Sequence, residues 1–165
     1  MKIDFNQMPD TSRLWIYAAS QPLTTEQKAK IQEQGDAFTE KWTYHQMPLN
    51  AAFTIIDDIF LVFALDIVNG DISGCGIDKS LRLVKDWEES FQLNLFNRLQ
   101  IEYKENDKVV LTTKAQLAEK LNQSTITPTT LFYNKLIQTK AELNTQFLIP
   151  FNQTWIYKQI ALTGN

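Results

Sequence analysis

The longest apolar stretch of the chain is Ile59-Phe60-Leu61-Val62-Phe63-Ala64-Leu65. Apolar residues occupy both faces of a strand drawn through it, which is typical of a central strand covered on both sides. Asn69-Gly70-Asp71 then ends the strand. The stretch is far too short to span a bilayer. We therefore predict that residues 59–65 form the central strand of a sheet in a protein without membrane insertion.

Upstream of this stretch, the sequence predicts two further strands. Residues 13–18 are aromatic and β-branched, and residues 49–56 lead into the central strand. Asp57-Asp58 lies between the second and the central strand and is expected to form a turn.

A helix is expected between the first two strands. Thr24-Thr25-Glu26-Gln27 matches a capping box with Thr24 as the N-cap. The residues behind it carry an apolar stripe that includes Ile31 and Gly35. A glycine costs a helix about 1 kcal/mol relative to alanine. Its place on the buried stripe therefore predicts close approach of a neighbouring backbone.

Downstream, a second helix and a further strand are expected. The helix is predicted to start near Asp78, and residues 98–103 alternate in the manner of a strand. The resulting order is β-α-β-β-α-β. We predict an α+β fold with a ferredoxin-like core over about residues 12–103, an antiparallel sheet with helices on one face. Residues 104–165 are expected to form a C-terminal α/β extension of the same single domain.

Composition and charge exclude several function classes. The formal net charge of −3 gives no general attraction to nucleic acid or anionic lipid. Residues 1–97 carry a net −6 and residues 98–165 a net +3. The single cysteine, Cys75, allows no intrachain disulfide and fits a reducing compartment. The N-terminus lacks the apolar run of a signal peptide, so a cytoplasmic location is expected.

The segment Ser73-Gly74-Cys75-Gly76-Ile77-Asp78-Lys79-Ser80 is the strongest candidate for a site. Its glycines allow backbone angles that other residues resist, and it precedes a predicted helix N-terminus, which favours negative charge. One interpretation is a loop that binds an anion. A second is a reactive Cys75, because a thiol at a helix N-terminus ionises more readily. A third is a tight turn with Cys75 as a packed side chain.

Lys79-Ser80 after a glycine-rich loop invites comparison with a phosphate-binding P-loop. That motif needs glycine on both sides of its four variable residues, where this chain has Ser73 and Asp78. Asp78 is instead expected to be the N-cap of the helix. Nucleotide hydrolysis of the P-loop type is therefore not expected.

His45 is the only histidine and the natural candidate for a general base. An exposed histidine without a function is the other interpretation. One histidine and one cysteine cannot build a standard structural zinc site, so no metal is expected. The sequence indicates no cofactor and contains no aromatic-basic signature of RNA binding.

Several segments carry a family resemblance: residues 12–17, 42–45, 49–51, 73–78, 139–143 and 150–155. They resemble a family of short, uncharacterised bacterial proteins often labelled "ABC transporter ATPase". The most specific piece is Ser73-Gly74-Cys75 with Ile77-Asp78, where the family pattern has serine at the position of Gly76. The label implies nucleotide binding, but the glycines of a phosphate loop are absent. We therefore do not transfer the ATPase activity.

Two functions follow as expectations. In the first, the protein is a small binding or regulatory module. Its loop accepts a small anion through Ser73, Gly74, Gly76, Lys79 and Ser80, or a sheet edge binds a protein partner. In the second, the protein is a thiol-dependent enzyme with Cys75 as nucleophile, His45 as base and loop N–H groups that stabilise negative charge.

Overall fold

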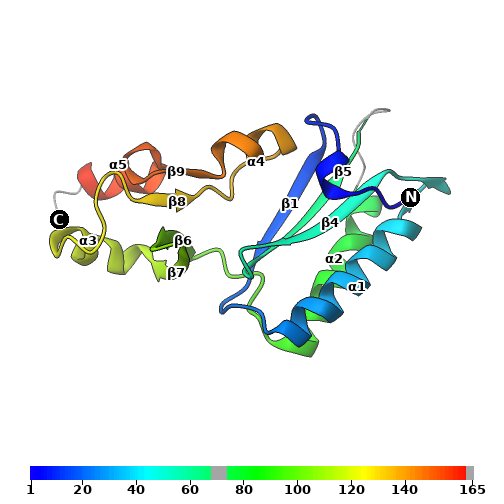
Figure 1. Cartoon of the computed structure of the whole chain (residues 1–165), viewed down its shortest axis with the longest axis horizontal. Helices are drawn as coiled ribbons and strands as arrows, with labels where there is room; N and C mark the ends of the chain where they lie inside the picture. The colour runs from blue at the N-terminus through cyan, green and yellow to red at the C-terminus, as the bar shows by residue number, and fades with distance from the viewer. Residues whose placement is uncertain (68–73, 163–165) are drawn as a thin grey trace. The chain divides into compact units, whose positions relative to one another are not determined.

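The chain forms two compact units (Figure 1). The computed structural model describes residues 1–67 and 74–162. The N-terminal unit comprises Met1–Phe96 and a returning segment, Gln138–Ala141, and the C-terminal unit comprises Asn97–Ile137 and Glu142–Asn165. Each unit combines helices with an antiparallel sheet, so the predicted α+β class is confirmed.

The N-terminal unit is built on a three-stranded antiparallel sheet with β5 (Phe60–Leu65) at its centre. β1 (Arg13–Ala18) and β4 (Ala51–Ile56) flank it in the order β1-β5-β4. All six residues of β5 are buried. The prediction of a central strand covered on both faces is therefore confirmed.

The turn between β4 and β5 contains Asp57 and Asp58, as predicted. Both residues have positive φ, 52° and 58°, which aspartate tolerates better than most residues. The N–H of Ile59 donates to the carbonyl of Ile56 at 3.2 Å and closes the turn. These angles give a primed turn, whose twist matches that of the strands it joins.

Two helices, α1 (Thr25–Lys41) and α2 (Gly74–Phe91), cover one face of this sheet (Figure 1). The N–H of Gln27 donates to Thr24 Oγ1 at 3.1 Å, and the N–H of Thr24 donates to Gln27 Oε1 at 3.0 Å. The predicted capping box at the start of α1 is therefore confirmed.

Gly35 lies on the buried face of α1, against the ring of Phe53 on β4. A β-carbon at this position would lie 2.3 Å from Cδ1 of Phe53. The ring is itself held by Phe63 and Trp87, with ring centroids 4.9 and 5.3 Å away. The predicted close approach at Gly35 is confirmed, but the neighbour is a side chain and not a backbone.

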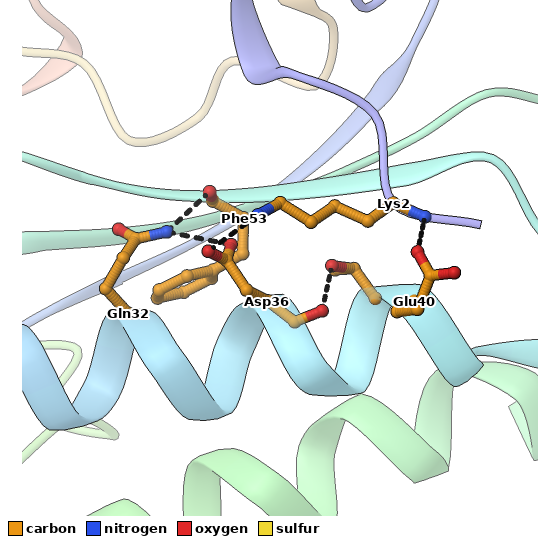
Figure 2. A network of polar contacts seen from close by, with 6 residues as sticks. Lys2, Gln32, Asp36, Glu40 and Phe53 are labelled. Carbon is orange, nitrogen blue, oxygen red and sulfur yellow. Dashed lines mark hydrogen bonds and ion pairs between the residues drawn. The ribbon is translucent and has the colours of Figure 1, made fainter.

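The first residues of the chain lie along the outer edge of β4, where Lys2 forms a parallel bridge with Ala51. Lys2 Nζ lies 2.9 Å from Asp36 Oδ2, and the backbone N–H of Lys2 donates to Glu40 Oε2 at 2.9 Å. The Gln32 amide donates to the other oxygen of Asp36 and to a carbonyl of β4 (Figure 2). These contacts tie α1 to the edge of the sheet.

The N-terminal unit also contains three short elements. η1 (Phe5–Gln7) precedes β1, and β2 (Thr43–Tyr44) and β3 (Met47–Pro48) form a small antiparallel hairpin after α1. His45 and Gln46 form its two-residue turn, both with positive φ (49° and 65°).

The C-terminal unit is built on a four-stranded antiparallel sheet in the order β7-β6-β8-β9. The strands are β6 (Gln100–Glu105), β7 (Lys108–Thr113), β8 (Leu131–Tyr133) and β9 (Leu148–Pro150). The helical elements are α3 (Lys114–Asn122), α4 (Lys140–Gln146), η2 (Phe151–Gln153) and α5 (Trp155–Leu162). The first two residues of α4 belong to the segment that returns to the N-terminal unit. The core contains Tyr103, Leu117, Ile126, Phe132, Phe151, Ile156 and Ile160.

The ferredoxin-like arrangement predicted for residues 12–103 is not confirmed, because its fourth strand lies in the other sheet. β6 pairs with β7 and β8 and not with β1. The edge of β1 is instead occupied by the segment Gln138–Ala141. The N–H of Leu14 donates to the Gln138 carbonyl at 2.9 Å, and the N–H of Lys140 donates to the Ser12 carbonyl at 3.0 Å. The local pattern identified the strand correctly, but the pairing is decided by residues far away in the sequence.

Candidate functional site

The glycine-rich segment singled out by the sequence forms the start of α2. The helix begins at Gly74, so Gly74, Cys75 and Gly76 lie in its first turn. Asp78 lies inside the helix and is exposed, so its prediction as the N-cap is wrong. Ser73 and the side chain of Cys75 lie outside the described residues.

Three residues of this segment, Gly76, Lys79 and Ser80, make hydrogen bonds within the protein. The indole Nε1–H of Trp42 donates to the carbonyl of Gly76 at 3.0 Å. Lys79 Nζ donates to the carbonyl of Thr43 at 3.1 Å, and Ser80 Oγ donates to the carbonyl of Ile77 at 2.7 Å. Ser80 is also buried. The Lys79 and Ser80 side chains, which were predicted to bind a ligand, thus bind backbone carbonyls.

His45 lies at the exposed tip of the hairpin formed by β2 and β3. Its ring centroid is 4.1 Å from that of Tyr44. The contacts of Trp42 and Thr43 with Gly76 and Lys79 attach the base of this hairpin to the first turns of α2. The hairpin of His45 and the helix of Cys75 are therefore neighbours.

A different site, which the sequence did not reveal, lies in the C-terminal unit. A cavity of about 450 Å³ is lined by residues of β6, β8, β9 and the start of α5, and all of its lining residues belong to this unit. We call it the C-terminal cavity. Its charged and apolar lining includes Arg98, Glu102, Phe132, Lys135, Leu136 and Trp155.

The wall of the C-terminal cavity contains a buried carboxylate, that of Glu102 on β6, whose exposed fraction is 0%. Lys135 Nζ lies 2.9 Å from both of its oxygens and donates to the carbonyl of Gln100 at 3.0 Å. The amide of Gln100 donates to Glu102 Oε2 at 2.8 Å. Oε1 is buried and makes no aligned hydrogen bond with any described residue, although the Lys135 ammonium lies 2.9 Å from it. The Lys135 side chain is 26% exposed and faces the more open side of the pair.

Two other donors line the cavity without a protein acceptor. Arg98 precedes β6 and makes no hydrogen bond or ion pair with any residue that the structure describes. The indole N–H of Trp155 likewise has no acceptor within the described part of the chain. Both side chains are exposed, so these donors are available to a ligand that enters the cavity.

The remaining wall is apolar. Phe132 and Ile156 are buried beneath it, whereas Trp155 is 53% exposed and Leu136 is 69% exposed. Large apolar side chains that stay exposed beside a cavity with a few polar groups are typical of small-molecule sites. The arrangement can bind the apolar body of a ligand and orient a polar group.

The described residues indicate neither a metal centre nor a membrane span. No group of three or more His, Cys, Asp or Glu side chains among them is placed to hold a metal ion. None of their helices combines the length and the apolar character needed to cross a bilayer.

The sequence carried little signal for this cavity. Gln100, Glu102 and Lys104 alternate with apolar residues, which is the pattern of a solvent-facing side of a strand. Gln100 and Glu102 are nevertheless buried. Lys135 lies 33 residues away in the sequence and no local spacing links it to Glu102.

Comparisons with known proteins identify no relative. No protein-family model, curated protein or solved structure matches this chain.

Proposed function

We propose that this chain is a ligand-binding module and that the C-terminal cavity is its ligand site. The observation that carries the proposal is the fully buried Glu102 at the wall of a cavity of about 450 Å³. Small-molecule sites fall in the range of about 300–1,000 Å³. Burial of an ion pair adds little stability by itself, because desolvation offsets most of the attraction. A role in a ligand site would explain why the chain contains a buried ion pair that adds little stability.

The rest of the wall supports the same proposal. Arg98 and Trp155 present donors, and Leu136 and Trp155 present apolar surface. This combination suits an amphipathic molecule, whose apolar body leaves water while a polar group finds a fixed partner. Other lining residues, Glu102, Phe132 and Ile149, come from three strands of one sheet, which hold this wall in a defined geometry.

Saturation-transfer NMR with naphthalene-1-acetamide tests the proposal. We expect transfer from the wild-type protein to the naphthalene protons and a loss of most of this transfer in Trp155→Ala. Leu99→Ala is the matched control, because Leu99 is 78% exposed and does not line the cavity. Equal transfer in Trp155→Ala and Leu99→Ala, or no transfer to the wild-type protein, would count against the C-terminal cavity as the ligand site.

A second candidate function is thiol chemistry at the start of α2, with Cys75 as nucleophile and His45 as base. The hydrogen bond from Trp42 to the carbonyl of Gly76, one residue after Cys75, favours it because it holds the hairpin of His45 against this helix. In this function the first turn of α2, including Gly74 and Gly76, stabilises negative charge through its backbone N–H groups.

The alkylation rate of Cys75, measured with iodoacetamide against pH, tests this second candidate. We expect a midpoint below the ordinary thiol pKa of about 8.5 and a higher midpoint in His45→Ala. A rate that is slow at all pH values, or a profile that His45→Ala leaves unchanged, would exclude the pair.

A further inference from the structure

Four charged side chains line the C-terminal cavity, and they are not equally available to a ligand. Glu102 and Lys135 neutralise each other, with the ammonium 2.9 Å from both carboxylate oxygens. Glu142 is already engaged in an interaction and lies in the first turn of α4, where a carboxylate is favoured. Arg98 has no partner among the described residues. Arg98 is therefore the one charged side chain of this wall that lacks a partner in the described part of the chain.

The positions of Glu102 and Lys135 disfavour a cationic ligand. Glu102 is fully buried, and the more exposed Lys135 lies beside it on the side open to solvent. A ligand cation that approached Glu102 would have to displace the Lys135 ammonium, which also donates to the carbonyl of Gln100. An anion meets no such obstacle at Arg98, whose guanidinium has no partner among the described residues and offers only donors.

On these grounds, and resting on the proposed function, we propose that the C-terminal cavity binds an amphipathic organic anion with one negative group and an apolar body. Arg98 binds the anionic group, because a guanidinium offers two parallel N–H donors to a carboxylate or sulfonate. The exposed faces of Trp155 and Leu136 cover the apolar body.

The isosteric pair naphthalene-1-acetate and naphthalene-1-acetamide tests the ligand class. The two probes share one apolar body and differ by the negative charge. We expect the dissociation constant of the acetate to be lower by about tenfold, since hydrogen bonds between charged groups are stronger than neutral ones and the exposure of Arg98 limits the gain. Arg98→Gln is expected to bring the two constants together, mainly by raising that of the acetate.

The control is Arg82→Gln, which removes the same charge from an exposed arginine of α2 that does not line the C-terminal cavity. It should keep the preference for the acetate. Equal affinity of wild-type protein for both probes, or a preference that persists in Arg98→Gln, overturns the anion inference and leaves the proposed function standing. Failure of the wild-type protein to bind either probe overturns both.

Discussion

The ammonium nitrogen of Lys135 lies 2.9 Å from each carboxylate oxygen of Glu102, and the Glu102 side chain is fully buried. The two residues come from different parts of the C-terminal unit, β6 and the segment after β8. Their pairing places both charges at the wall of a cavity and leaves Arg98 as its unpaired cation. The stability of the C-terminal unit and the binding properties of its cavity therefore depend on the same few side chains.

Removal of one charge of the Glu102–Lys135 pair should lower the free energy of unfolding far more than removal of both charges. Lys135→Met leaves the buried carboxylate of Glu102 without a cation, which is expected to lower the free energy of unfolding by about 3 kcal/mol. The double variant Glu102→Gln/Lys135→Met contains no uncompensated charge and should recover most of this loss. Urea unfolding of the full chain, followed by circular dichroism, measures both values.

Lys28→Met is the matched control for this experiment. Lys28 Nζ lies 2.9 Å from Asp58 Oδ1, but both side chains are substantially exposed. Exposed pairs of this kind contribute about 0–1 kcal/mol. If Lys135→Met costs no more than Lys28→Met, the Glu102–Lys135 pair does not have the role assigned to it.

Gly35→Ala is expected to destabilise the N-terminal unit. Alanine favours a helix by about 1 kcal/mol over glycine. The new methyl group would however lie 2.3 Å from Cδ1 of Phe53, whose ring is held by Phe63 and Trp87. Overpacking of this kind costs about 1–3 kcal/mol and outweighs the gain. Thermal unfolding should show a lower Tm, and the loss should shrink in a Phe53→Leu background. A Tm that rises in Gly35→Ala would contradict this packing.

Lys140 anchors the returning segment to the N-terminal unit. Its side chain is buried, and Nζ donates to the carbonyls of Asn6 and Met8 at 3.1 and 2.9 Å. Lys140→Met leaves both carbonyls without this donor. We expect amide hydrogen exchange at Leu14, which donates to Gln138, to accelerate by about tenfold. The amide of Phe63 in the central strand should keep its protection. Unchanged exchange at Leu14 would show that Lys140 does not hold the segment.

Burial raises the pKa of Tyr17 above its ordinary value of 10.0. Above about pH 10 the unfolded chain loses this proton before the folded protein does, so the folded state binds more protons and the free energy of unfolding falls as pH rises. The stability is fully present below about pH 10 and is lost on the alkaline side. Tyr17→Phe should reduce this alkaline loss. Urea unfolding at mildly and strongly alkaline pH measures it, and an identical pH dependence in both proteins would contradict the assignment.

Local patterns in the sequence predicted the elements whose structure is decided locally. The apolar run of β5, the aspartate turn before it and the capping box of Thr24 were all confirmed. The partner of β6 was not predictable in this way. The alternation of its side chains indicates a strand, but nothing in it distinguishes β1 from β7 and β8 as neighbours.

The start of α2 was misplaced for a physical reason that the structure makes clear. Gly74 and Gly76 disfavour a helix, and Asp78 is a good N-cap residue, so the sequence placed the first turn too late. The hydrogen bond from the buried Trp42 to the carbonyl of Gly76 lies within this turn. Tertiary contact therefore overrides local propensity there. The C-terminal cavity was not predicted because it also depends on tertiary contacts. Glu102 is buried by residues that are distant from it in the sequence.

The indole N–H signals of Trp42, Trp87 and Trp155 provide the most direct test of the C-terminal cavity as the ligand site. The indoles of Trp42 and Trp87 donate to Gly76 and Gln34 in the N-terminal unit, whereas Trp155 lines the cavity. We would titrate ¹⁵N-labelled protein with naphthalene-1-acetate and assign the Trp155 signal with Trp155→Phe. We expect the Trp155 signal to shift and saturate while the Trp42 and Trp87 signals stay in place. A stationary Trp155 signal, or shifts of Trp42 and Trp87 instead, would contradict it.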